Sequence, residues 1–276
     1  MFADLHIHTN FSDGIYSPKE IITQALIADL KKISITDHDI FLGNIEAKKI
    51  ITKNNLDIEI ISGVEFSCFH NGTEFHIIGL FIDFDNLLIN SVIDDMQNKR
   101  IESIKNIIEH LRSKNIHLNY NDILSYARGS IGRPHIGKEL VNKGYAKDIN
   151  QAFDKYLSNN LLEGIREPRL PLEKAIDAIN NAGGLSILAH PDLSNKKLFD
   201  YIKEMKKFGL KGIEVSSPRY GLFRQKEIIE LSNIFQLLQS GGSDFHGFHK
   251  GIDISKVNGL TEEEYCKILN YKKDND

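Results

Sequence analysis

Short apolar runs alternate with amphipathic stretches along most of this 276-residue chain. Apolar runs of this length predict strands, and amphipathic stretches predict helices. The alternation favours an α/β fold with a parallel sheet or barrel, because parallel strands are joined by helical crossovers. Predicted strands that recur over about 200 residues suit a barrel better than a doubly wound sheet. We therefore predict an α/β barrel.

The predicted elements can be placed along the sequence by their turn and capping signals. The predicted strands cover residues 2–8, 32–36, 58–69, 74–84, 185–189, 212–216 and 235–240. The predicted helices cover residues 18–30, 43–54, 93–114, 120–127, 134–143, 149–157, 172–181, 197–207, 222–233 and 262–271. Asn71-Gly72 is a hairpin signal between the third and fourth strands.

The stretch 96–168 differs from the rest of the chain, because it contains predicted helices and no strand pattern. We predict two units: a barrel made of residues 1–95 and 169–276, and a helical insertion domain, 96–168, that contributes to substrate phosphate binding. Residues 96–170 hold 13 Lys and Arg against 8 Asp and Glu, while the whole chain has a net charge of −4. This contrast suggests cations held by the acidic barrel and an anion met by the insertion, or simply two differently solvated surfaces.

Composition excludes several classes of protein. Hydrophobic residues make up 41% and charged residues 26%, which is typical of a globular protein and not of a disordered chain. The two cysteines cannot form a disulfide framework or a thiolate zinc site. We find no signal peptide and no membrane-spanning run, so we expect a cytoplasmic protein with no membrane partner and no obligate protein partner.

Histidines and carboxylates gather at the predicted strand ends. Two of them, His6 and His8, lie two residues apart on the first strand, so both side chains point to the same side. Most of the others follow a strand, at the face where α/β barrels place their active sites. The nine residues of this set are His6, His8, Asp13, His38, Glu65, His76, His190, Asp244 and His246.

This set predicts a metal site. A single histidine at a strand end is usually structural, and a lone Asp-Gly is usually a turn, but nine such residues on one face are poorly explained one by one. Imidazole and carboxylate ligands without thiolates suit Mn, Fe or Zn. Nine ligands exceed the coordination of one ion, so we predict two to three divalent metal ions.

The motifs that carry these residues resemble the PHP family, which is named for polymerase and histidinol phosphatase. They are DLHIHTNFSDG, ITDHD, GVEFS, the isolated His76, LAHPD and GGSDFHG, in that order. The resemblance implies a distorted (β/α)7 barrel with a trinuclear metal centre. It implies one metal held by His6, His8, Glu65 and Asp244, a second by Glu65, His76 and His190, and a third by Asp13, His38 and His246.

The predicted insertion carries the segment Gly132-Arg133-Pro134-His135-Ile136-Gly137. Arg133 offers a planar fork to a phosphate, and His135 offers a further hydrogen bond; the alternative is a helix-capping turn with a surface arginine. The segment resembles the branch of the family that removes phosphate from 3',5'-nucleoside bisphosphates and the similar enzymes that trim RNA from its 5' end. Arg219, after a later strand, is a second predicted phosphate contact.

We therefore predict a metal-dependent hydrolase of phosphate esters. His6, His8, Glu65, Asp244 and Arg133 are the predicted catalytic residues. The expected partner is a phosphorylated small molecule, most specifically a 3',5'-nucleoside bisphosphate from which the 3'-phosphate is removed. A short 5'-phosphorylated RNA is a further possible substrate. The alternatives are a small-metabolite phosphomonoesterase of the histidinol phosphatase type and a non-catalytic, metal-stabilised PHP module.

Overall fold

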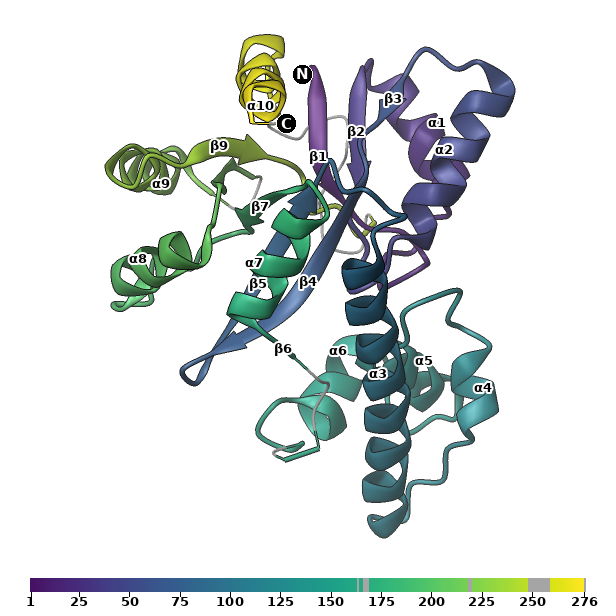
Figure 1. The fold of residues 1–276 in the computed structure, drawn as a ribbon. Coiled ribbons are helices and arrows are strands. Elements are labelled where there is room, and N and C mark those ends of the chain that lie inside the picture. Colours follow the sequence, from purple (N-terminus) through teal and green to yellow (C-terminus); the bar gives the residue numbers. More distant parts are fainter. Residues whose placement is uncertain (163, 166–168, 218–219, 248–258, 276) are drawn as a thin grey trace.

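The protein is described by a computed structural model that covers residues 1–162, 164–165, 169–217, 220–247 and 259–275. Its strands gather in the centre and most of its helices lie outside them (Figure 1). The strands form two sheets, one of order β1-β2-β3 and one of order β6-β4-β5-β7-β8-β9. Isolated parallel bridges connect the sheets, from Ile7 to Phe245 and from His38 to Glu65. The predicted α/β architecture is confirmed, although no continuous ladder closes the barrel in the described residues.

The strands agree with the predicted positions with two exceptions. They are β1 (Ala3–Ile7), β2 (Lys32–Ile35), β3 (Glu59–Ile60), β4 (Gly63–His70), β5 (Thr73–Leu80), β6 (Leu170–Pro171), β7 (Leu185–Leu188), β8 (Gly212–Ser216) and β9 (Leu238–Gly241). The predicted strand 58–69 is divided between β3 and β4, which lie in different sheets. The short strand β6, which pairs with β4, falls where no strand was expected. Two residues are too few to give a sequence pattern.

The sheet is mixed, and not purely parallel as the alternation of elements suggested. The turn Asn71-Gly72 has positive φ at both residues, 46° and 82°, which suits a tight hairpin. It therefore folds β5 antiparallel against β4. β5 also runs antiparallel to β7, while β7, β8 and β9 are mutually parallel. The hairpin thus places His76, in the middle of β5, beside β4 and next to the end of β7.

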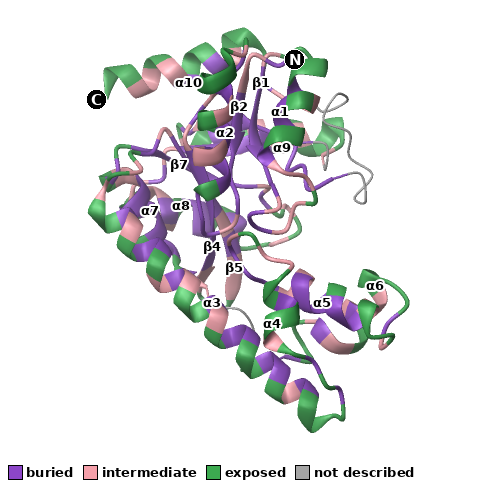
Figure 2. Ribbon diagram, turned by 90° about the vertical axis from the view of Figure 1, so that its right-hand side faces the viewer, coloured by how far each residue is buried: buried purple, intermediate pink, exposed green. Residues whose placement is uncertain are grey.

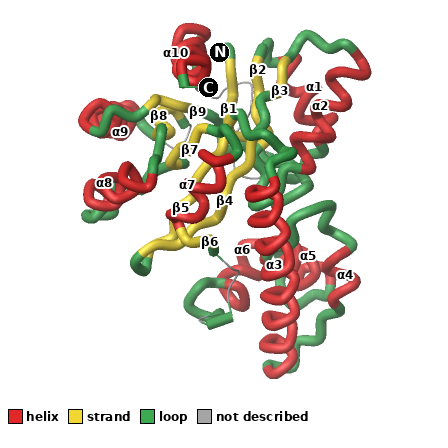
Figure 3. The backbone as a smooth tube through the Cα atoms, viewed as in Figure 1, coloured by secondary structure: helices red, strands yellow, loops and turns green. Residues whose placement is uncertain are grey.

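The helices lie near their predicted positions. They are α1 (Pro18–Ile27), α2 (Leu42–Asn54), α3 (Leu87–Ser113), α4 (Tyr120–Leu124), α5 (Arg133–Asn142), α6 (Ile149–Ala152), the π-helix η1 (Phe153–Leu157), α7 (Leu172–Asn181), α8 (Leu198–Phe208), α9 (Leu222–Ile234) and α10 (Glu262–Asp274). However, α3 begins six residues before the predicted start at residue 93, and the predicted helix 149–157 is divided into α6 and the π-helix η1. Figure 3 shows the helices around the strands, with α3 to α6 at the lower end. No helix among the described residues is both long enough and apolar enough to span a membrane.

The long helix α3 belongs to two hydrophobic clusters. Its first half contributes Val92 and Met96 to the cluster that also holds residues of β4, β5 and α7. Its second half contributes Ile104 and Ile108 to a separate cluster formed with α4, α5 and the following segment. Figure 2 shows the buried strands and the alternately buried and exposed turns of α3. One rigid helix thus connects the strands to the helical region, by which we mean the second half of α3 together with α4 to η1.

Candidate metal centre

The nine predicted metal-binding residues converge on one place, although they come from seven different segments. His6 lies in β1, Glu65 in β4 and His76 in β5, while the others lie in the loops after β1, β2, β7 and β9. They form four overlapping groups whose ligand atoms lie within 4.8 Å of one another: His8, Asp13, His38 and His246; His6, His190 and Asp244; His6, His8 and Glu65; His38, Glu65 and His76. The residues that the sequence analysis selected therefore lie together in the structure.

Glu65 lies at the middle of the cluster. Its Oε2 atom is 3.3 Å from His6 Nε2, 3.1 Å from His8 Nε2 and 3.2 Å from His38 Nδ1. Its Oε1 atom is 3.1 Å from both His76 Nδ1 and His190 Nε2. Each carboxylate oxygen therefore faces a different set of imidazoles, which is the arrangement of a carboxylate that bridges two ions. Glu65 was expected at the end of a strand, but it is the third residue of β4.

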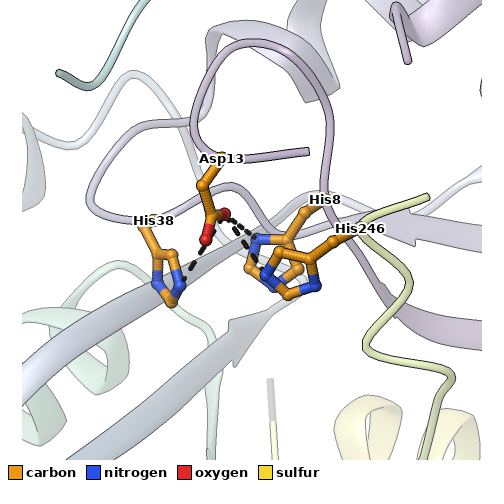
Figure 4. Close-up of side chains that lie close together, drawn as sticks. All are labelled: His8, Asp13, His38 and His246. Atoms are coloured by element: carbon orange, nitrogen blue, oxygen red, sulfur yellow. Dashed lines mark ion pairs between the residues drawn. The ribbon is translucent and has the colours of Figure 1, made fainter. Parts of the chain in front are cut away.

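Asp13 organises a second group, shown in Figure 4. Its Oδ1 atom lies 3.2 Å from His246 Nε2, 3.6 Å from His8 Nδ1 and 4.0 Å from His38 Nε2. Asp244 Oδ1 contacts His8 Nε2 at 3.3 Å and His6 Nε2 at 3.5 Å, which connects this group to the Glu65 group. The two groups form one continuous site.

The backbone near β9 allows His6 to approach closely. A Cβ atom placed on Gly242 would lie 2.5 Å from the Cβ and N atoms of His6, so only glycine fits there. Asp4 Oδ1 accepts hydrogen bonds from the N–H groups of His6 and Ser243, which fixes β1 against the loop after β9. Asp244 and His190 have positive φ, 50° and 25°, a strained conformation of the kind found at functional sites.

The electrostatics of the cluster suit a cation. Burial opposes ionisation of Glu65, but the charges of His6 and His38 hold its pKa well below the usual range. Burial likewise opposes ionisation of Asp13, but His246 and His38 hold the pKa of that carboxyl well below its usual range. Burial opposes charge on His8, yet contacts with Asp244 and Glu65 raise its pKa to about 9. The buried carboxylates are thus ionised and attract positive charge.

Hydrogen bonding leaves ligand atoms available at the centre of the cluster. His8 Nδ1, His38 Nδ1 and Glu65 Oε2 are buried atoms without a hydrogen-bond partner in the described structure. A buried polar atom without a partner is unfavourable, and metal ions bound in the cluster would give these atoms partners. Imidazole and carboxylate donors are typical of Mn, Fe and Zn sites. The residues present therefore fit divalent metal ions.

A buried carboxylate that the sequence analysis missed supports this cluster. Glu214 lies in β8 and is only 1% exposed. Its Oε1 atom is 3.0 Å from His6 Nδ1, and its Oε2 atom accepts a hydrogen bond from the His190 N–H group at 2.8 Å. A carboxylate on the second ring nitrogen fixes the orientation of a metal-binding histidine. No sequence motif marks this residue, because Glu214 appears as one polar residue in a short strand.

The two acidic residues beside His38 have other partners. Asp37 accepts hydrogen bonds from Thr9 N, Thr9 Oγ1 and Ser12 Oγ at 2.7, 2.6 and 2.6 Å. Asp39 accepts a hydrogen bond from Ser67 N and forms an ion pair with Arg100. Both carboxylates therefore fix the backbone segments that carry metal-site residues.

Replacing Glu214 with Gln is expected to weaken metal binding. The amide oxygen of Gln can accept a hydrogen bond from His6 Nδ1 or from the His190 N–H group, but its NH2 group must then face the other of these two donors. We expect the affinity for Mn²⁺ to fall by about 10- to 100-fold, as measured by calorimetric titration of the metal-free protein. Glu230→Gln, on the exposed side of α9, is the matched control and should bind Mn²⁺ like the unmodified protein. Equal Mn²⁺ affinity in both variants would contradict the role of Glu214.

A cavity of about 200 Å³ opens over the cluster and carries three guanidinium groups. Its walls include His38, His76 and Asp13 from the cluster, together with Arg100, Arg133 and Arg169. Arg169 was missed by the sequence analysis because it lies in a turn with no motif. Arg100 is paired with the buried carboxylate of Asp39. The guanidinium groups of Arg133 and Arg169 in the cavity wall make the cavity suitable for an anion such as phosphate.

The predicted phosphate-binding residues have three outcomes. Arg133 lies in the cavity wall, and its Nη1 donates to Leu157 O at 3.0 Å and to Asn159 Oδ1 at 2.7 Å. His135 also lines the cavity, but its Nδ1 accepts a hydrogen bond from Gly132 N–H and so caps α5. The alternative interpretation, a helix-capping turn, is therefore correct for His135 Nδ1. Arg219 lies outside the described residues.

Comparison with known proteins identifies related enzymes. A family model described as the PHP domain matches residues 4–161. The 5'-3' exoribonuclease Rnm of Salmonella typhimurium is 30% identical over 88% of this chain and 84% of its own length. The 3',5'-nucleoside bisphosphate phosphatase of Chromobacterium violaceum is 28% identical over 90% of this chain and 88% of its own length. A solved structure from Bifidobacterium adolescentis, assigned as a metal-dependent phosphoesterase, superposes with a TM-score of 0.86, 26% identity and coverage of 98% and 96%.

Proposed function

This chain belongs to the PHP family, and from that premise we propose that it is a metal-dependent phosphoesterase that hydrolyses the 3'-phosphate of 3',5'-nucleoside bisphosphates. The observation that carries this proposal is the position of Glu65, whose two carboxylate oxygens face separate sets of histidines beneath a cavity with three arginines. The relatives that hydrolyse phosphate esters of nucleotides or RNA support the choice of substrate.

The proposed ligand sets follow the family resemblance and fit the observed contacts. His6, His8, Glu65 and Asp244 would hold one ion, Glu65, His76 and His190 a second, and Asp13, His38 and His246 a third. The nine residues all occur in the observed groups, and the contacts of Glu65 on both of its oxygens fit a bridge between the first two sets. The proposed cofactors are therefore two to three divalent ions.

The chain's own residues would bind the substrate and stabilise developing charge. Divalent ions held by the cluster would supply a metal-activated water as the nucleophile. Arg133 and Arg169 would neutralise the phosphoryl oxygens, since both reach the cavity above the cluster. Arg100 is engaged with Asp39 and fixes the cavity wall. Glu214 would keep His6 and His190 in their binding orientation.

In the proposed domain division, one unit binds the metal ions and the other contributes substrate contacts. Residues 1–95 and 169–276 would form the barrel with the metal site, and residues 96–168 would form the insertion that contributes substrate contacts. The small cavity supports this division, because it is lined by metal-cluster residues on one side and by Gly132, Arg133 and Phe153 on the other.

Phosphate release from adenosine 3',5'-bisphosphate tests the proposed function. The protein loaded with Mn²⁺ should release inorganic phosphate and leave adenosine 5'-monophosphate, identified by chromatography against both monophosphate standards. Short 5'-phosphorylated RNA and histidinol phosphate, assayed in parallel, represent the two alternative substrates. Turnover of histidinol phosphate with no release from the bisphosphate would favour the small-metabolite phosphatase and overturn the proposal.

Replacing Arg133 with Met should reduce kcat/KM for the bisphosphate by about 100-fold, because a fixed guanidinium no longer neutralises the phosphoryl group. The bound metal, measured by mass spectrometry, should stay unchanged. Arg112→Met, an exposed substitution in α3, is the control and should keep full activity. A loss of metal in Arg133→Met would show that the residue supports the metal site instead of binding substrate.

A further inference from the structure

A second, larger cavity lies beside the small one and shares four lining residues with it, namely Ser12, Asp13, Pro134 and His135. We call it the outer cavity. Its volume is about 680 Å³, compared with about 200 Å³ for the cavity over the metal cluster. The smaller volume lies below the range of small-molecule binding sites, about 300–1,000 Å³, whereas the larger one lies within it. A nucleotide bound at the cluster would extend beyond the small cavity, and the outer cavity shares a wall with it.

The walls of the outer cavity come from both the barrel loops and the helical region. Ile15 comes from the loop after β1, and its N–H group donates to His246 O at 3.0 Å, which fixes this wall to the metal cluster. Ile149, at the start of α6, lies in the cavity wall together with Lys138 of α5. The outer cavity is thus held at a set position relative to the metal-binding residues.

The lining chemistry suits a nucleoside. Ile15 and Ile149 are large apolar side chains that are 52% and 41% exposed, although both line the cavity. Tyr126 adds an aromatic ring, and the Lys138 ammonium lies 4.5 Å from the centre of that ring. The amides of Asn10 and Asn150 supply hydrogen-bond donors and acceptors. Apolar walls combined with a few amide groups are what a flat, polar-edged base requires.

We propose that the outer cavity binds the base and ribose of the nucleotide whose phosphate is hydrolysed at the metal cluster. This assignment rests on the proposed function, and it names which part of the substrate the helical region recognises. It predicts that recognition of the nucleoside and recognition of the phosphate can be separated by substitutions.

The test compares the binding of two phosphate esters that differ only in the base. Adenosine 5'-monophosphate and ribose 5-phosphate are titrated calorimetrically into the protein loaded with Mn²⁺, and into its Ile15→Ser and Ile149→Ser variants. The matched control is Ile234→Ser, at the end of α9, which is 63% exposed and does not line the outer cavity. Figure 1 shows the helix α9 at the upper left of the molecule and α6 at its lower centre. Because all three isoleucines are exposed, the variants are expected to fold, and thermal unfolding checks this.

The unmodified protein should bind adenosine 5'-monophosphate at least about tenfold more tightly than ribose 5-phosphate. Each cavity variant should weaken binding of the nucleotide by about fivefold to thirtyfold, because an apolar contact is lost, and should change binding of ribose 5-phosphate by less than about twofold. Equal affinities of the unmodified protein for both ligands, or nucleotide binding that both variants retain in full, would overturn the assignment. Preferential nucleotide binding without phosphate release from adenosine 3',5'-bisphosphate would keep the nucleoside site and overturn the proposed function alone.

Discussion

Replacing Glu65 with Gln is expected to reduce phosphate release from adenosine 3',5'-bisphosphate by about 1,000-fold or more, because metal ions supply the nucleophile and the charge stabilisation of such reactions. Glu65 has the most contacts in the cluster, with five histidine nitrogens within 3.3 Å of its two oxygens. The substitution keeps the shape of the side chain and removes its charge. In Gln, an NH2 group that cannot bind a metal replaces one of the two carboxylate oxygens, so the side chain can contact metal through one oxygen only.

The metal content of Glu65→Gln separates this explanation from misfolding. Mass spectrometry should find at least one metal ion fewer per chain than in the unmodified protein, with an unchanged circular dichroism spectrum. The same substitution at Glu204, a partly exposed glutamate that pairs with His70, is the control and should change neither activity nor metal content. Full metal content together with full activity in Glu65→Gln would contradict the bridging role.

Replacing Arg100 with Met is expected to lower the free energy of unfolding by about 3–5 kcal/mol, the usual effect of removing one partner of a buried ion pair. Arg100 is 5% exposed and Asp39 is fully buried. The guanidinium donates from Nε to Asp39 Oδ2 at 2.9 Å and from Nη1 to Ile131 O at 3.4 Å. Without Arg100, the carboxylate of Asp39 would be a buried charge that keeps the hydrogen bond from Ser67 N–H to Oδ1 but has lost its cationic partner.

Urea unfolding of the metal-free protein measures this effect without the contribution of bound metal. Arg112→Met, in the same helix but with an exposed partner, Glu109, should change the unfolding free energy by about 0–1 kcal/mol. The double variant with Asp39→Asn should recover part of the loss, since the uncompensated charge is removed. Equal stabilities of Arg100→Met and Arg112→Met would show that the buried ion pair contributes nothing to the fold.

The elements and the metal cluster could be predicted from the sequence because their signals are local. His6 lies in β1 and His8 directly after it, and the turn Asn71-Gly72 specifies its own hairpin. The helix that begins at Pro18 carries a capping box from Ser17 to Glu20. In each case the residues that decide the structure are neighbours in the chain.

The supporting residues could not be predicted, because they act across long separations in sequence. Glu214 lies 208 residues from His6 in the chain, and Arg100 lies 61 residues from Asp39. Neither belongs to a motif, and a buried charged residue in a strand or helix looks like any exposed one until its partner is known. The contact of Glu65 with His76 likewise depends on the antiparallel strand β5, which brings His76 to the cluster.

The most direct test of the central claim is a titration of the metal-free protein with Mn²⁺, in which phosphate release from adenosine 3',5'-bisphosphate is followed as metal is added. Chelation should abolish phosphate release, and activity should return with Mn²⁺ and reach its maximum at two to three equivalents per chain. The same titration of Glu65→Gln should recover little activity at any amount of metal. Full activity in protein shown by mass spectrometry to contain no metal would contradict the account.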